Sequence, residues 1–168
     1  RVLPDFLDAA VSRESARARE GIESSGFSRL SGLRWPRAGV CMHALADTMD
    51  SLREHGFPPV FIFLYDQTWS LLCHLFDVAA DVLGADDADS LEMGLSVFAW
   101  SLSAQGSSEK RVGSNFGQPH RDQSYSECHT ADGRLAMCTL WVAVAAATVD
   151  SGCMHFLSKG VDALLDEP

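Results

Sequence analysis

The chain has 168 residues, the length of one ordinary domain, and its 46% apolar content is enough for a hydrophobic core. A net charge of −10, with the basic residues scattered, argues against a nucleic-acid or anionic-membrane partner, since both favour clustered Lys and Arg. The longest apolar run, residues 57–65, is broken by Pro58 and Pro59, so we expect a soluble protein without a membrane span.

The cysteines are five in number and form no Cys-x-x-Cys pair. This pattern suits buried thiols better than a disulfide framework, and it favours an intracellular, reducing compartment such as the cytoplasm. Because the sequence begins with Arg1 and not Met, we expect it to start inside a longer chain, and its targeting signals stay open.

Helical periodicity predicts two helices early in the chain. The first covers Pro4 to about Ile22, which is rich in Ala, Arg, Glu and Ser. The second ends at Gly56, which can cap it, and Pro58, which cannot continue it. The apolar positions of this second helix recur at helical spacing and are Cys41, Leu45, Met49 and Leu52.

A third and longer helix is predicted from about Asp66 to Leu83, ending at Gly84. The preceding residues 60–65 fit either a strand or the first turns of the same helix, and the acidic residues 85–90 predict a solvated turn. We expect the broad apolar stripe of this helix to face the core; its members are Trp69, Leu72, Cys73, Phe76, Ala79, Ala80 and Leu83.

Beyond residue 90 the pattern changes to that of strands. Residues 93–102 and 135–145 are apolar on both faces, which predicts strands covered on both sides. Asp132-Gly133 between them is a hairpin signal, and residues 153–157 give one more short strand. The polar residues 105–113 fit a mobile lid, but a plain surface connection is the favoured interpretation.

Helices followed by closely spaced strands predict an α+β fold in one domain spanning residues 1–168. We expect residues 1–90 to form the mainly helical part. Residues 91–168 would supply the first strands of a jelly-roll-like β core on which the helices pack.

One short motif suggests a specific chemistry. His120 and Asp122 lie two positions apart just after Pro119, which disfavours a helix. Extended backbone would place both side chains on one face, where a divalent metal can bridge them. With a further histidine from elsewhere they would form the facial triad of non-haem Fe(II) oxygenases. A surface ion pair is the alternative, because chance alone gives about half of one His-x-Asp in a chain of this composition.

The other nucleophile and ligand candidates are weaker. His155 is expected to be a hydrogen-bonded strand residue and not the third ligand, and His129 to be a loop residue. Cys128 beside His129 is interpreted as a free loop thiol, since adjacent residues in an extended chain point apart. The remaining histidines fall on helices without a partner at metal-pair spacing; they are His43, His55 and His74.

Three stretches together resemble the phytanoyl-CoA dioxygenase (PhyH-like) branch of the Fe(II)/2-oxoglutarate oxygenases. They are His120-Arg121-Asp122-Gln123, Thr139-Leu140-Trp141-Val142-Ala143-Val144, and Ala147-Thr148-Val149-Asp150-Ser151-Gly152-Cys153-Met154. The likeness is clear over about the last 55 residues and looser over residues 60–84.

The resemblance implies a double-stranded β-helix in which His120 and Asp122 bind Fe(II) and Trp141 lines the wall near the 2-oxoglutarate co-substrate. It also implies hydroxylation of a small or lipid-like substrate by O₂, coupled to conversion of 2-oxoglutarate to succinate. The iron carries the difficult chemistry, while the protein supplies placement and excludes water.

The chain departs from the family pattern in three ways. Relatives take a third ligand histidine and a 2-oxoglutarate arginine from strands well beyond the turn at Asp150-Ser151-Gly152, and the sequence stops at Pro168, so we expect a fragment with half a site. Arg121 stands where the family frequently has Gln, and Ser158-Lys159-Gly160 stands where Pro-Gly-Ser-His is common. The alternative function is therefore a non-catalytic jelly-roll binding or scaffold domain with an incomplete metal site.

Overall fold

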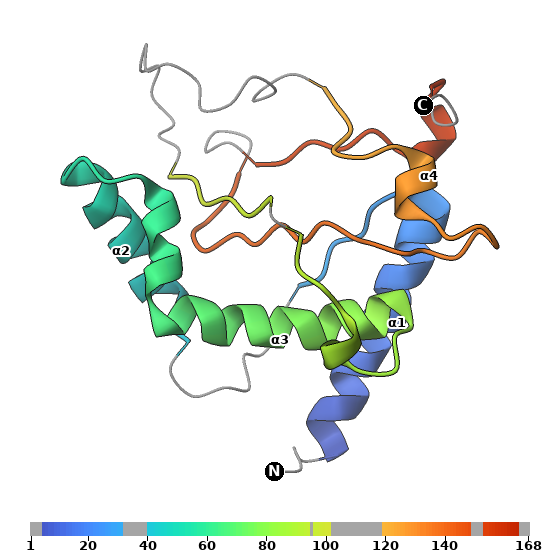
Figure 1. Cartoon of the computed structure of the whole chain (residues 1–168), viewed down its shortest axis with the longest axis horizontal. Coiled ribbons are helices and arrows are strands. Elements are labelled where there is room, and N and C mark those ends of the chain that lie inside the picture. The colour runs from blue at the N-terminus through green and yellow to red at the C-terminus, as the bar shows by residue number, and fades with distance from the viewer. Residues whose placement is uncertain (1–4, 32–39, 95, 102–118, 149–152, 165–168) are drawn as a thin grey trace.

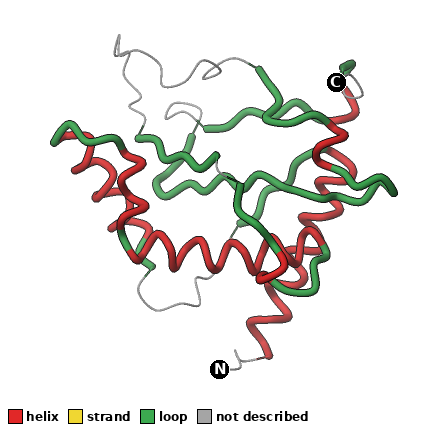
Figure 2. The backbone as a smooth tube through the Cα atoms, viewed as in Figure 1, coloured by secondary structure: helices red, strands yellow, loops and turns green. Residues whose placement is uncertain are grey.

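The structure is a computed structural model that describes residues 5–31, 40–94, 96–101, 119–148 and 153–164. Helices lie around a central region of loop segments (Figures 1 and 2). The helical elements are α1 (Asp5–Ser25), α2 (Met42–Glu54), the 3₁₀ helix η1 (Pro59–Leu64), α3 (Asp66–Leu83), η2 (Ala88–Ser90), α4 (Tyr125–Cys128) and η4 (Lys159–Val161).

Helix α3 connects the two halves of the described structure, because it contributes to two separate hydrophobic clusters. Its N-terminal half, through Leu71 and Leu75, packs with α2 and η1, and its C-terminal half, through Val78 and Val82, packs with Ala18 of α1. Figure 1 shows α2 at one end of α3 and α1 crossing the other. The two clusters therefore hold α1 and α2 at opposite ends of α3.

The C-terminus of α3 is closed by a residue of α1. Gly84 adopts a left-handed conformation with φ of 70°, which glycine reaches without steric cost. The Nε of Arg19 donates a hydrogen bond to the carbonyl of Val82 at 2.9 Å, and its Nη2 donates to the carbonyl of Asp81. A cation thus satisfies carbonyls at the negative end of the helix dipole.

The three long helices lie where periodicity predicted them. The bounds of α3 match the prediction, and Leu45 and Met49 of α2 are buried as expected. The predicted stripe of α3 is correct at Ala79 and Ala80, which are buried, and wrong at Trp69, which is 47% exposed, and at Cys73, which is exposed. The residues that α3 buries are Thr68, Leu71, His74, Leu75, Val78, Ala79, Ala80 and Val82.

Residues 60–65 form neither a strand nor the first turns of α3. They lie in or directly after η1, which is separated from α3 by extended backbone at Tyr65. Two side chains of the first turn of α3 bond back to it: Thr68 Oγ1 donates to the carbonyl of Ile62 and Trp69 Nε1 to that of Phe63, both at 2.7 Å. The carbonyl of Ile62 also accepts the amide of Tyr65 at 3.1 Å, so it receives two hydrogen bonds.

The described residues of the segments predicted as strands run as loops through the centre of the molecule (Figure 2). Ala99, Val142 and Val144 pack on the cluster formed by α2, η1 and α3. Phe98 is 64% exposed and stacks on Trp100 with ring centroids 5.5 Å apart, so in the described part these residues are not covered on both sides. The jelly-roll core stays a prediction.

The hairpin signal at Asp132-Gly133 is confirmed. An antiparallel bridge joins His129 to Leu135, and the amide of Thr130 donates to the carbonyl of Arg134 at 2.8 Å. Gly133 has a φ of 81°, which only glycine adopts readily.

All five cysteines are free thiols, as expected, but they are not buried. Cys41 and Cys73 are exposed, and Cys128, Cys138 and Cys153 are partly exposed. Cys41 directly precedes α2, and Cys73 lies on the outer face of α3, which explains their contact with solvent.

Candidate metal site

His120 and Asp122 lie side by side. The Nε2 of His120 is 3.3 Å from Oδ1 of Asp122, and their side chains are 41% and 56% exposed. The intervening Arg121 makes its ion pair elsewhere, with Asp162. The side chains of His120 and Asp122 thus lie together while Arg121 contacts another segment, at the start of a bend that includes Asp122.

The separation of this pair is compatible with one bridging cation. Ligand atoms bound at about 2.1 Å on adjacent corners of an octahedral ion lie about 3.0 Å apart. The observed 3.3 Å is close to that value, and a neutral imidazole with an ionised carboxylate is a donor set that suits Fe(II). The same distance also fits a plain hydrogen-bonded ion pair, so the geometry permits a metal without requiring one.

Within the described ranges, no group of three His, Cys, Asp or Glu side chains gathers around a common point. His155 lies near Cys153, with Nε2 3.8 Å from Sγ, and His129 stacks on the ring of Tyr125 at 3.9 Å. The described residues thus bring His120 and Asp122 together but place no third such side chain beside them.

The chain immediately after the pair is ordered by a short helix. The carboxylate of Glu127 in α4 accepts hydrogen bonds from the amide of Ser124 at 2.8 Å and from its hydroxyl at 2.7 Å. These bonds hold the pKa of Glu127 below its ordinary value. The turn that follows Asp122 is therefore fixed by a charged acceptor at the start of α4.

Cys128 is not an activated nucleophile. Burial raises the pKa of its thiol, and the carboxylates of Glu127 and Asp122 raise it further. A catalytic thiol needs the opposite environment, one that stabilises the thiolate. The interpretation of Cys128 as a free thiol fits this environment.

Trp141 lies on the segment after the hairpin and is 42% exposed. Its neighbour Val142 packs on the hydrophobic cluster, so Trp141 projects from a segment that is anchored on one side. Its role beside the co-substrate stays a prediction.

Sequence reasoning missed the partner of Arg121. The Nη2 of Arg121 lies 2.6 Å from Oδ2 of Asp162, a residue 41 positions later in the chain. No spacing rule connects residues so far apart, and the substitution of Arg for the more frequent Gln was the one signal that pointed at this position.

A comparison with known families covers the part of the chain that contains this pair. The sequence model of the phytanoyl-CoA dioxygenase (PhyH) family matches residues 37–159, which include His120, Asp122 and Trp141. The match places the chain in the superfamily of Fe(II)/2-oxoglutarate-dependent oxygenases. Within that superfamily, the chain belongs to the phytanoyl-CoA dioxygenase family.

Searches of curated proteins and of solved structures gave no match. Among the described helices, none is both long and apolar enough to cross a bilayer.

Proposed function

We propose that this chain takes part in Fe(II)- and 2-oxoglutarate-dependent hydroxylation of a small or lipid-like organic substrate by O₂. The observation that carries the proposal is the family match over residues 37–159, which contain a His-x-Asp pair at bridging distance. Members of this family generally use Fe(II) and 2-oxoglutarate.

In this proposal His120 supplies a neutral imidazole nitrogen and Asp122 a carboxylate oxygen to the same ion. Bound iron would supply the activation of O₂ that is coupled to decarboxylation of 2-oxoglutarate. Trp141 would shield the co-substrate from water. The jelly-roll core proposed for residues 91–168 is supported by the hairpin at Gly133 and by the apolar contacts of Val142 and Val144.

The test replaces His120 and Asp122 by Ala, one at a time, in the protein. We expect each change to abolish Fe(II) binding and succinate formation, because one remaining ligand from this segment cannot hold the ion. His129→Ala is the matched control, since His129 is a histidine of the same region that stacks on Tyr125. Binding is measured by calorimetry under anaerobic conditions, and succinate by mass spectrometry.

Retained turnover in both variants would overturn the assignment of the ligands. A wild-type protein that binds neither Fe(II) nor 2-oxoglutarate would instead support a non-catalytic binding or scaffold domain built on the same family fold.

A further inference from the structure

Arg121 connects the His-x-Asp motif to a distant part of the chain. Its side chain is 35% exposed and that of Asp162 only 19%, so the ion pair between them is partly shielded from water. An N–O distance of 2.6 Å is that of a charge-assisted hydrogen bond. Such a contact restrains two segments more firmly than an exposed ion pair does.

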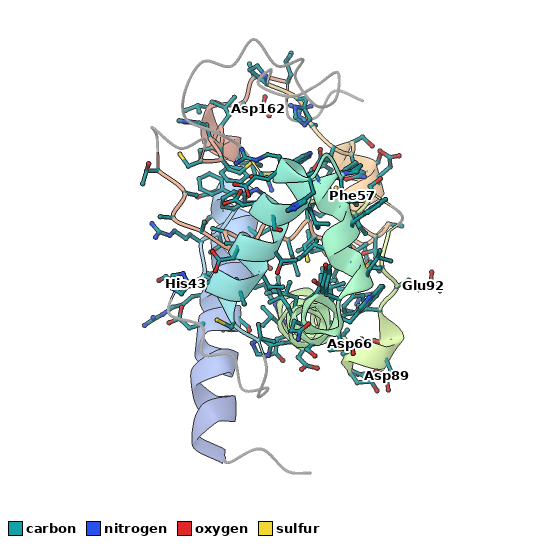
Figure 3. The ribbon with its side chains drawn as sticks, turned by 90° about the vertical axis from the view of Figure 1, so that its left-hand side faces the viewer. His43, Phe57, Asp66, Asp89, Glu92 and Asp162 are labelled. Atoms are coloured by element: carbon teal, nitrogen blue, oxygen red, sulfur yellow. The ribbon has the colours of Figure 1, made fainter. Side chains whose placement is uncertain are left out.

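Asp162 is itself held in place. Its Oδ1 accepts a hydrogen bond from the amide of Leu164 at 3.1 Å, while Oδ2 accepts from Arg121. Both carboxylate oxygens are therefore engaged. In Figure 3, Asp162 lies at the top of the view, away from Asp66 and Asp89 near the two ends of α3.

The segment that carries Asp162 is anchored to α1 and α4. The ring of Phe156 stacks on that of Phe27 with centroids 4.9 Å apart, and Lys159 Nζ donates to the carbonyl of Glu23 at 3.4 Å. Lys159 also lies over the ring of Tyr125 in α4, 5.4 Å from its centroid. Figure 1 shows α1, α4 and the C-terminal segment gathered on one side of the molecule.

We propose that the Arg121–Asp162 ion pair is a positioning device for the metal ligands. By tying the residue between His120 and Asp122 to a segment anchored on α1, it holds the backbone so that the two ligands stay at bridging distance. This inference rests on the proposed function.

A second effect of the pair has to be separated from positioning. Without Asp162, the guanidinium charge of Arg121 would lie unneutralised next to a bound cation and would weaken its binding. Replacing Arg121 distinguishes the two effects, because it removes the repulsive charge together with the tether. Positioning predicts weaker metal binding in Arg121→Gln, whereas electrostatics alone predicts equal or tighter binding.

The experiment measures Co(II) affinity, by the visible absorption of the bound ion, in the wild type, Arg121→Gln, Asp162→Asn and the double variant. We expect each single change to weaken binding about tenfold, the lower end of the range for residues that support metal ligands. The double variant should be no weaker than either single one, because both changes break the same link. Unchanged or tighter binding in Arg121→Gln would overturn the proposal.

A matched control pair lies in the hairpin. The Nε of Arg134 is 2.8 Å from Oδ2 of Asp132, and their side chains are 77% and 61% exposed. This pair closes a local turn and joins no distant segments. Arg134→Gln and Asp132→Asn should therefore leave Co(II) affinity within twofold of the wild type, and a comparable loss in these controls would overturn the proposal.

Hydrogen exchange gives a readout that does not depend on metal. Arg121→Gln should speed amide exchange in residues 120–124 and 159–164, while Arg134→Gln should not. If the wild type fails to bind Co(II), the proposed function fails, and the exchange data alone decide whether the tether exists. If amide exchange is unchanged in Arg121→Gln, the Arg121–Asp162 ion pair does not restrain these segments, and the proposal is overturned whether or not Co(II) affinity changes.

Discussion

At the scale of single residues, the carboxylate of Glu127 gives the turn after Asp122 a pH-dependent stability. Hydrogen bonds from Ser124 lower its pKa from the ordinary value of 4.5, so the unfolded chain takes up this proton first as the pH falls. The stabilisation by this carboxylate is complete when the pH is above the pKa of Glu127 in the unfolded chain. It is lost as the pH falls through the lower pKa that Glu127 has in the folded protein.

We therefore expect Glu127→Gln to flatten the dependence of the free energy of unfolding on pH between about pH 5 and pH 3. Urea unfolding of both proteins across this range is the measurement. Glu92→Gln is the control, because Glu92 is exposed and lies outside any helix. Parallel pH profiles for the wild type and Glu127→Gln would contradict the prediction.

At the candidate site, only local proximity was predictable. His120 and Asp122 were expected side by side because residues i and i+2 of an extended chain share a face, and their side chains do lie 3.3 Å apart. The contact between Arg121 and Asp162 depends on how η4 docks on α1, so the sequence around either residue could not reveal it.

At the scale of secondary-structure elements, the end of α3 carries the sharpest prediction. A Cβ added at Gly84 would lie 3.2 Å from Nη2 of Arg19, the group that binds the last carbonyls of α3. Gly84→Ala should cost about 1 kcal/mol from the positive φ, and about 1 kcal/mol more if Arg19 loses its hydrogen bonds. Chemical denaturation measures the change in the free energy of unfolding.

Gly56 offers a matched control, because it has a φ of 78° and open space where a Cβ would go. Gly56→Ala should lower the free energy of unfolding only by the amount that comes from the positive φ. In an Arg19→Ala background the two glycine substitutions should become equal. An equal cost for both in the wild type would show that Arg19 moves aside without loss.

The error in the stripe of α3 has a physical cause. The helix is apolar over more than half of its circumference, so two neighbouring stripes compete in the sequence. The stripe that is buried contains Thr68 and His74, and because these side chains are polar, the sequence does not show it as an apolar stripe. Thr68 is buried because its hydroxyl bonds to the carbonyl of Ile62, a contact that periodicity cannot anticipate.

At the scale of the whole molecule, apolar surface is left in contact with solvent along the central and C-terminal segments. Six large side chains there are 37–66% exposed; they are Phe98, Trp100, Leu140, Trp141, Phe156 and Leu157. Patches of this kind mark interaction surfaces or favour self-association.

We expect residues 1–168, expressed alone, to bind a hydrophobic dye such as ANS and to unfold over a broad transition, as loosely packed states do. Dye fluorescence and calorimetry at several protein concentrations are the measurements. A monomer with one sharp cooperative transition would contradict this expectation and would show that the chain packs well by itself.

The sequence anticipated the helices better than their assembly. α1, α2 and α3 follow from periodicity and from the caps at Gly56 and Gly84, which are local signals. Their arrangement depends on which half of α3 each neighbour covers, and that choice rests on contacts such as Ala18 with Val78. The predicted β core depends on pairing between segments far apart, for which a single sequence carries no direct signal.

The stacking of Phe27 on Phe156 and the bond from Lys159 to Glu23 have a consequence for synthesis on the ribosome. Glu23 and Lys159 are 136 residues apart, so α1 emerges roughly ten seconds before its C-terminal partner at ordinary rates of translation. During that interval the ring of Phe27 lacks its partner. This contact can therefore form only after nearly the whole described chain has been synthesised, so the packing of the C-terminal segment on the end of α1 is a late step of folding on the ribosome.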